Sequence, residues 1–264
     1  MIESIHQSMI GTALKCGERF RRRYIEREKI PAGVEAARGQ GVHTASKINL
    51  RQKVVTGFDL PVSDLKDAAR DGYVRSLSDG VYLPPDDLPH KRVILNQGLN
   101  EAIRLTGLYA DQVAPAIHPV RVEEPFTLDV GLPVPLGGTM DFEERESIGD
   151  LKTAGKPWNA GREKIEIQAK LYAYVFEKKT GIRPEFRYHI LISKKQTVSL
   201  QPLSIIPSIA DYLAMLLTVS RFWQMVQSGI FLPAEPGAWW CSSRWCVYHS
   251  TCPFVGNGKQ KMWV

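Results

Sequence analysis

The chain has 264 residues, 44% of them hydrophobic, and its 34 Lys and Arg against 28 Asp and Glu give a net charge of +6 and a pI near 9.1. Such a chain can bury a substantial core as one large domain, or as a domain with an appendage, and its charge suits a polyanionic partner. The N-terminus lacks a basic segment followed by a long apolar stretch, and the most apolar region, residues 205–223, contains Pro207, Asp211 and Arg221. We therefore expect neither a signal peptide nor a membrane span, and a soluble cytoplasmic protein.

The first half of the chain has the periodicity of helices. A helix is expected after the glycines that end at Gly41, and a Pro-rich connection is expected over 82–90. The expected helices cover residues 8–29, 42–55, 63–79 and 95–111.

The period then changes to that of strands. Residues 120–153 are rich in β-branched residues broken by Gly and Pro, which predicts a meander of strands. A helix over 162–181, ending at Gly181, is followed by an alternating strand over 185–195 and a long helix over 208–228. This order predicts an α/β fold with a mixed central sheet flanked by helices.

Two aspartates and a lysine stand out within the predicted meander. Asp150 and Lys152 are two residues apart on a strand and would share one face, as an exposed ion pair or as part of a site. A short hairpin can bring Asp141 beside Asp150, and two close carboxylates favour a hard cation such as magnesium or manganese. A neighbouring lysine can activate water or offset charge on a phosphate. Glycines before each aspartate would leave room for a ligand.

These residues form part of a larger pattern. The segment Gly39–His43 reads G-x-x-x-H, Asp141 is followed by Asp150 and Lys152 as D-x-K, and Gln168 and Tyr172 form Q-x-x-x-Y on a predicted helix. The set resembles the PD-(D/E)XK nuclease superfamily in its RecB-like branch.

The resemblance implies a restriction-endonuclease-like core and a role for each residue. Asp141, Asp150, the carbonyl of Leu151 and the imidazole of His43 would hold magnesium or manganese, and Lys152 would assist the attacking water. Gln168 and Tyr172 would position the substrate or the lysine. The expected organisation is a single nuclease domain over 1–264, with a helical insertion over 45–112, the catalytic sheet and helix over 120–200, and a cysteine-rich tail over 233–264.

The four cysteines lie at the two ends of the chain. Cys16 is alone, whereas Cys241, Cys246 and Cys252 form C-x4-C-x5-C. Zinc, an iron–sulfur cluster, or four unrelated thiols are all compatible with this spacing, and disulfides are not expected without secretion. The arrangement resembles RecB-like nucleases of the AddB type and the CRISPR-associated nuclease of spacer acquisition, although Gly17 replaces their proline and x4 replaces their first x2 spacing. That resemblance implies a [4Fe-4S] cluster that joins the two ends, with zinc as the alternative.

An arginine-rich stretch follows Cys16. On a regular helix, Arg19, Arg22 or Arg23, and Arg27 would lie along one face. This face is either simply solvated or contacts DNA phosphates without sequence specificity.

Together these features predict a metal-dependent DNA nuclease. We expect a stand-alone exonuclease in recombination, repair or phage DNA processing, acting on single strands or DNA ends, with a helicase or recombination partner. The alternative is a catalytically vestigial DNA-binding or interaction module with a structural iron–sulfur or zinc site.

Overall fold

The computed structural model describes residues 2–255, so the last nine residues of the predicted cysteine-rich tail lie outside the described residues. The helices differ widely in length, and α3 and α5 are the longest. They are α1 (Gln7–Lys15), α2 (Gly17–Phe20), α3 (Val34–Thr56), α4 (Val62–Ser76), α5 (Lys91–Gln112), α6 (Arg162–Ile165), α7 (Ile167–Thr180) and α8 (Ile209–Ser228). Shorter turns of 3-10 or π helix are η1 (Arg21–Ile25), η2 (Pro85–His90), η3 (Ala114–Ala116) and η4 (His249–Thr251).

A mixed five-stranded sheet forms the centre of the fold, in the order β1-β4-β5-β6-β7. β5 and β6 pair in parallel and the other neighbours pair antiparallel, while β2 and β3 form a separate two-stranded sheet. The strands are β1 (Arg121–Val122), β2 (Pro125–Leu128), β3 (Leu136–Thr139), β4 (Phe142–Glu143), β5 (Ser147–Ala154), β6 (Glu185–Lys194) and β7 (Thr197–Ile205). The predicted α/β class with a mixed sheet flanked by helices is confirmed.

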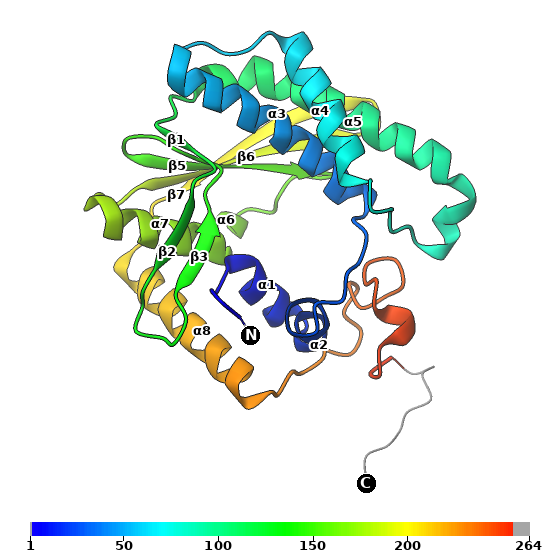
Figure 1. Cartoon of the computed structure of the whole chain (residues 1–264), viewed down its shortest axis with the longest axis vertical. Helices are drawn as coiled ribbons and strands as arrows, with labels where there is room; N and C mark the ends of the chain where they lie inside the picture. The colour runs from blue at the N-terminus through cyan, green and yellow to red at the C-terminus, as the bar shows by residue number, and fades with distance from the viewer. Residues whose placement is uncertain (1, 256–264) are drawn as a thin grey trace.

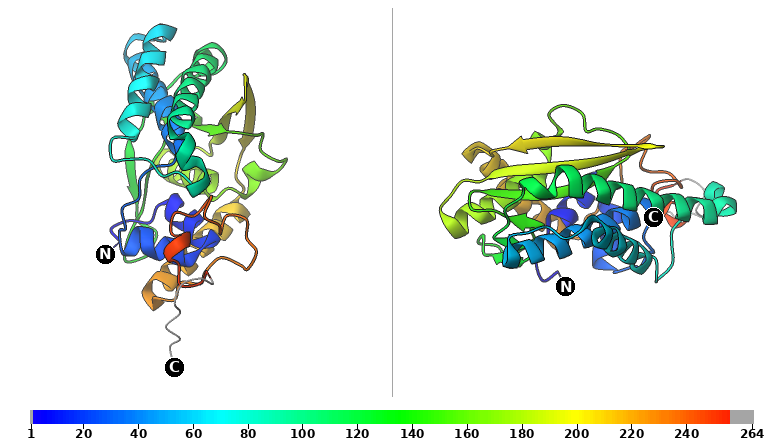
Figure 2. Two further views of the ribbon diagram at one scale, coloured as in Figure 1. Left: turned by 90° about the vertical axis from the view of Figure 1, so that its right-hand side faces the viewer. Right: turned by 90° about the horizontal axis from the view of Figure 1, so that it is seen from above.

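Helices cover both faces of this sheet (Figures 1 and 2). Side chains alternate between the faces along each strand. Leu151 and Leu191 belong to the apolar cluster beneath α3, α4 and α5, whereas Ile148 and Ile190 belong to the cluster shared with α1, α7 and α8. The sheet is therefore the middle layer of the fold.

The N-terminal part of α3 differs from the prediction. The helix begins at Val34, seven residues before Gly41, so the glycines lie inside it. A Cβ on Gly41 would stand 2.7 Å from the carbonyl oxygen of Ala69 on α4, and one on Gly39 would stand 3.2 Å from Thr153 Oγ1 on β5. These glycines therefore permit close packing and do not break the helix.

The predicted single helix over 8–29 is also wrong. It is interrupted at Cys16, whose backbone is extended, and it continues as α2 and the π-helical turn η1. The Gly17 amide donates a hydrogen bond of 2.7 Å to the carbonyl of Leu232, so a contact with the far end of the chain fixes the break.

Two smaller differences concern the C-terminal half. The helix predicted over 162–181 is divided at Glu166, although it ends at Gly181 in the left-handed conformation as expected. β7 was not among the predicted strands, and it contains Pro202. An edge strand accommodates proline, since one side of it makes no ladder hydrogen bonds.

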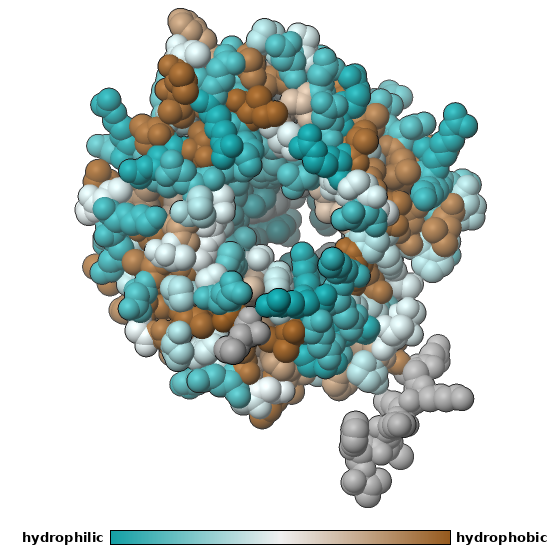
Figure 3. Space-filling view, in the orientation of Figure 1, coloured by the Kyte–Doolittle hydropathy of each residue, from teal (hydrophilic) through white to brown (hydrophobic). Residues whose placement is uncertain are grey.

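The space-filling view shows an opening near the middle of one face, between α3 above and α1 and α2 below (Figure 3). Within residues 2–255, no helix has the length and apolarity needed to cross a membrane.

Candidate active site

The β4–β5 hairpin brings the two predicted carboxylates together. Asp141 directly precedes β4, and Phe142 pairs with Gly149 across the hairpin, so Asp141 reaches the strand that carries Asp150. The backbone amide of Leu151 donates a hydrogen bond of 3.0 Å to Asp141 Oδ2. This bond attaches the first carboxylate to the residue that follows the second.

Asp150 is buried, with only 2% of its side chain exposed. Its Oδ1 accepts hydrogen bonds from Lys152 Nζ at 3.0 Å and from Gln168 Nε2 at 2.6 Å. Its Oδ2 lies 2.8 Å from Lys152 Nζ but has no partner in hydrogen-bonding geometry. One carboxylate oxygen is thus held firmly and the other retains unused acceptor capacity.

Opposing effects act on Lys152. Burial alone would lower the pKa of its ammonium, but the carboxylates of Asp150 and Asp141 outweigh burial and raise that pKa. Lys152 is therefore a cation at neutral pH, and its positive charge is directed at the carboxylate pair.

Asp141 has the opposite character. Burial raises the pKa of its carboxyl to about 6; His43 opposes this rise and the Asp150 charge adds to it. His43 on α3 places its Nδ1 3.4 Å from Asp141 Oδ2. The imidazole, the two carboxylates and the lysine therefore form one continuous polar group, as the resemblance implies.

Gln168 and Tyr172 come from one face of α7, four residues apart. Gln168 contacts Asp150 directly, as described above. Burial, followed by the charges of Asp150 and Asp141, raises the pKa of Tyr172, whose ring packs edge-on against Phe126 of β2 at 5.4 Å. Gln168 is thus a direct neighbour of the carboxylates, whereas Tyr172 packs between α7 and the small sheet.

The glycines near the aspartates do not leave room for a ligand, contrary to our expectation. A Cβ on Gly149 would stand 1.8 Å from the ring of Phe142, and one on Gly138 would stand 2.8 Å from the ring of Phe126. Aromatic rings of the protein itself occupy the space beside them.

One ion pair beside the site was missed in the sequence. Lys47 pairs with Glu123, whose backbone amide donates a hydrogen bond of 3.0 Å to the carbonyl of Asp141. Glu123 has a φ of 47°, an uncommon conformation for a residue other than glycine. The spacing of Lys47, one helical turn after His43, was the only available signal, and nothing in the sequence indicated Glu123.

The donor types around Asp150 suit magnesium or manganese. Two carboxylates, a backbone carbonyl and an imidazole are hard or borderline ligands, and the buried Asp150 Oδ2 lacks a hydrogen bond. The residues fit such a cation chemically, although within the described chain no three His, Cys, Asp or Glu side chains are arranged as a ready metal shell.

The four cysteines lie where the two ends of the chain meet. Trp240 Nε1 donates to the carbonyl of Lys15 at 3.3 Å, and Arg22 reaches Thr251 Oγ1 at 2.8 Å. Burial and then the other three thiols raise the pKa of Cys241, so all four belong to one electrostatic neighbourhood. All four, Cys16, Cys241, Cys246 and Cys252, are half-buried and free of disulfides. The thiol donor set fits an iron–sulfur cluster or zinc, though it too is not arranged as a ready metal shell in residues 2–255.

The predicted arginine face does not form, because Arg21–Ile25 is a π-helical turn and residues three or four apart no longer lie one above the other. Arg22 pairs with Glu28 and stacks over the ring of Tyr248 at 4.5 Å, so it links the N-terminal segment to the tail. Arg19 is half-buried, whereas Arg23 and Arg27 are exposed.

Comparisons with known proteins support the fold. The sequence matches no model of a known protein family and none of the curated proteins. The chain is similar in structure to a candidate exonuclease from Eubacterium rectale, with a TM-score of 0.58 and 11% identity over 89% of this chain and 86% of that one. A further structure, of a protein named SSO0001, matches with a TM-score of only 0.37 at 11% identity, over 94% of this chain and 95% of that one. The chain thus shares its fold with this candidate exonuclease.

Proposed function

We propose that the protein is a metal-dependent DNA nuclease of the PD-(D/E)XK superfamily that acts as an exonuclease. The observation that carries the proposal is the contact of Asp150 with both Lys152 and Gln168, beside Asp141 and His43. In an ordinary surface ion pair the acid is exposed and no second carboxylate lies beside it. Asp150 is buried and has Asp141 beside it, so it is not such a pair. The fold shared with the candidate exonuclease is consistent with this function.

Each side chain of the candidate active site has a separate proposed role in phosphodiester hydrolysis. Asp150 and Asp141, with His43 and the carbonyl of Leu151, would hold magnesium or manganese. Such an ion acts as a Lewis acid and lowers the pKa of bound water. Lys152 remains a cation, so it can stabilise negative charge that develops on the phosphate. Gln168 fixes the orientation of the Asp150 carboxylate through its short hydrogen bond.

The substrate proposed is single-stranded DNA or a DNA end. The opening in Figure 3 supports this substrate, because a single strand fits such an opening more easily than a continuous duplex does. The net charge of +6 also favours a polyanion. Arg19, Arg23 and Arg27, near the N-terminal end, are proposed to contact phosphates, while Arg22 holds the tail. The biological setting proposed is recombination, repair or phage DNA processing, with a helicase or recombination partner.

The four cysteines are proposed to hold a [4Fe-4S] cluster, or zinc in its place, that joins the two ends of the chain. Hydrogen bonds between the two ends, from Trp240 Nε1 to the carbonyl of Lys15 and from the Gly17 amide to the carbonyl of Leu232, support this role. Ligand binding at such a site contributes to folding, because the ligands come from distant parts of the chain.

End-labelled single-stranded DNA tests the nuclease activity. The wild-type protein should shorten the strand with manganese or magnesium and should be inactive in EDTA. Asp150→Asn, which keeps the shape but removes the charge, should abolish cleavage, whereas Asp211→Asn, a carboxylate change on α8, should not. Cleavage by Asp150→Asn at the wild-type rate would refute the proposal. Binding without cleavage by the wild-type protein would favour the vestigial DNA-binding module.

A further inference from the structure

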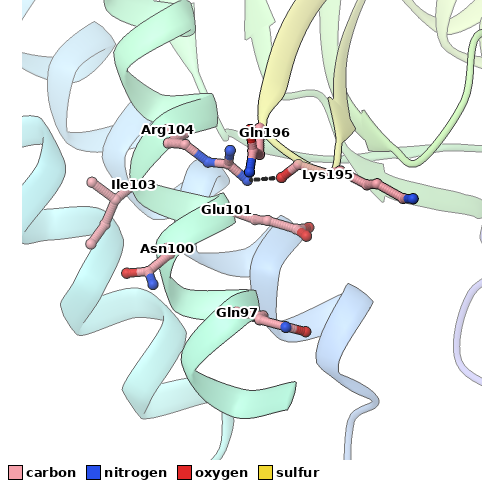
Figure 4. Close-up of a pocket in the computed structure, with 7 residues that line it drawn as sticks. All are labelled: Gln97, Asn100, Glu101, Ile103, Arg104, Lys195 and Gln196. Atoms are coloured by element: carbon pink, nitrogen blue, oxygen red, sulfur yellow. Dashed lines mark hydrogen bonds between the residues drawn. The ribbon is translucent and has the colours of Figure 1, made fainter. Parts of the chain in front are cut away.

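A polar pocket lies outside the candidate active site, between α5 and the turn that joins β6 to β7 (Figure 4). Its volume is about 740 Å³, and the residues that line it are Gln97, Asn100, Glu101, Ile103, Arg104, Lys195 and Gln196. Gln97, Glu101 and Arg104 are spaced by four and three residues on α5, so they share one helix face. In the close-up these three side chains extend on the side of the β6–β7 turn.

One guanidinium group of the pocket lining, that of Arg104, has an unused donor. Arg104 Nη2 donates a hydrogen bond of 2.8 Å to the carbonyl of Lys195, but its Nε is buried without a hydrogen-bond partner. Arg38 on α3 is not one of the lining residues, but it pairs with Glu101, which is. Because buried donors are nearly always paired, the unsatisfied Nε–H of Arg104 favours a further acceptor beside this side chain.

The charges at the pocket favour an anion. Glu101 is the only acid among the lining residues, and Arg38 compensates its charge, so Arg104 and Lys195 supply an uncompensated positive charge. Arginine is suited to phosphate because its planar group offers several donors. The lining contains amide side chains but no aromatic ring, so base stacking is absent and contacts to phosphate and sugar remain.

The position of the pocket relates it to the active site. Lys152 of β5 pairs with Ile190 of β6, and Lys195 lies five residues farther along the chain. At about 3.3 Å per strand residue, this corresponds to about 16 Å along the sheet. Lys152 lies on the face of the sheet that packs against α7, whereas the pocket lies on the side of α5. A DNA strand that joins them must pass around the end of β6, so it needs more than the five or so nucleotides, spaced by about 3.4 Å, that the distance along the sheet corresponds to.

We propose that this pocket binds a backbone phosphate of the DNA strand more than about five nucleotides away from the scissile bond. The proposal rests on the proposed nuclease function and adds a second contact point to it. A free phosphate or mononucleotide has the same chemistry, so the test must separate these ligands from a strand that spans both sites.

The test measures binding of fluorescently labelled single strands to the full-length protein in EDTA, which prevents cleavage. Strands of about four nucleotides are too short to reach from the active site to the pocket, whereas strands of about twelve span both. Arg104→Gln removes the guanidinium. Lys195→Asn removes a charge but suits the positive φ of 35° at this position and keeps the carbonyl that Arg104 contacts. Arg183→Gln, before the opposite end of β6, is the charge-matched control.

Arg104→Gln should weaken binding of the long strand about tenfold, the effect of losing one charge-assisted hydrogen bond. The slope of log Kd against log salt should fall by about 0.7, as expected for one lost phosphate contact on a single strand. Lys195→Asn should have a smaller effect in the same direction. Binding of the short strand should be unchanged, and Arg183→Gln should bind both strands as the wild-type protein does.

Three outcomes would overturn the proposal. The first is that both variants bind the long strand as the wild-type protein does, while the wild-type protein still cleaves that strand with manganese. This result would refute the role of the pocket but not the nuclease function. This is also the result expected of a pocket for free phosphate. Equal weakening of both strands would indicate a structural role for Arg104. A wild-type protein that neither binds nor cleaves either strand would remove the nuclease function and this proposal together.

Discussion

Asp141 should make the metal-free protein less stable in alkaline than in acidic solution. Burial raises the pKa of its carboxyl from 3.8 to about 6. A carboxyl whose folded-state pKa lies above its unfolded value contributes stability below the unfolded pKa, and this contribution is lost as the pH rises through the folded pKa. The difference of about two pH units corresponds to about 3 kcal/mol in the free energy of unfolding, at about 1.36 kcal/mol per unit.

Asp141→Asn isolates this effect, because asparagine resembles the protonated acid and can still accept the hydrogen bond from Leu151. In EDTA at about pH 8 the variant should be more stable than the wild-type protein by about 3 kcal/mol, and the difference should shrink toward zero near pH 4. Urea unfolding followed by tryptophan fluorescence, repeated across this pH range, measures the difference directly.

Asp211→Asn provides a control of opposite sign. Hydrogen bonds from the backbone and hydroxyl of Ser208, and then from Lys170, lower the pKa of Asp211 to about 2. Its contribution to stability is present above the unfolded pKa and is lost only as the pH falls through about 2, so this variant should be destabilised by a constant amount between about pH 5 and 8. The reasoning about Asp141 is refuted if Asp141→Asn is less stable than the wild-type protein at pH 8, or if the difference does not depend on pH.

Three further changes test the site and its surroundings. Lys152→Met should lower the turnover of DNA cleavage by about two to three orders of magnitude, because the cation opposite the developing charge is lost; near wild-type specific activity would show that the lysine is only an ion-pair partner. Gly149→Ala should reduce the free energy of unfolding by about 3 kcal/mol or more in urea, since its methyl group would stand 1.8 Å from the buried ring of Phe142. Cys16→Ser should lose the iron of anaerobically purified protein, about four atoms per chain, and should make both chain ends sensitive to protease; retention of the metal would contradict the shared site.

The parts of the structure that the sequence predicted depend on short-range relations. The hairpin that joins Asp141 to Asp150 needs only a polar turn between two short apolar strands. The end of α7 follows from Gly181, which adopts a φ of 76°, and the start of α8 follows from Ser208, whose side chain caps the helix. Each of these signals lies within about ten residues of the feature that it determines.

The features that were missed depend on contacts between distant segments. The break at Cys16 is fixed by the hydrogen bond of Gly17 with Leu232, which lies more than two hundred residues farther along the chain. The helix was predicted to begin only after Gly41, because local sequence does not show that this glycine packs closely against Ala69 of α4. The ion pair of Lys47 with Glu123 requires α3 to cross the end of β1, a relation that only the tertiary fold establishes.

The parallel pairing of β5 and β6 explains how Gln168 comes to join the candidate active site. Parallel neighbours need a crossover connection, because the chain must return to the edge at which the first strand began. Here α6 and α7 make this connection, and the first turn of α7 lies beside β5, where Gln168 reaches Asp150 Oδ1 at 2.6 Å. A hairpin between β5 and β6 would have no such helix, and Asp150 would lose the amide that orients it. The position of Gln168, which orients the Asp150 carboxylate, is therefore a consequence of the strand order.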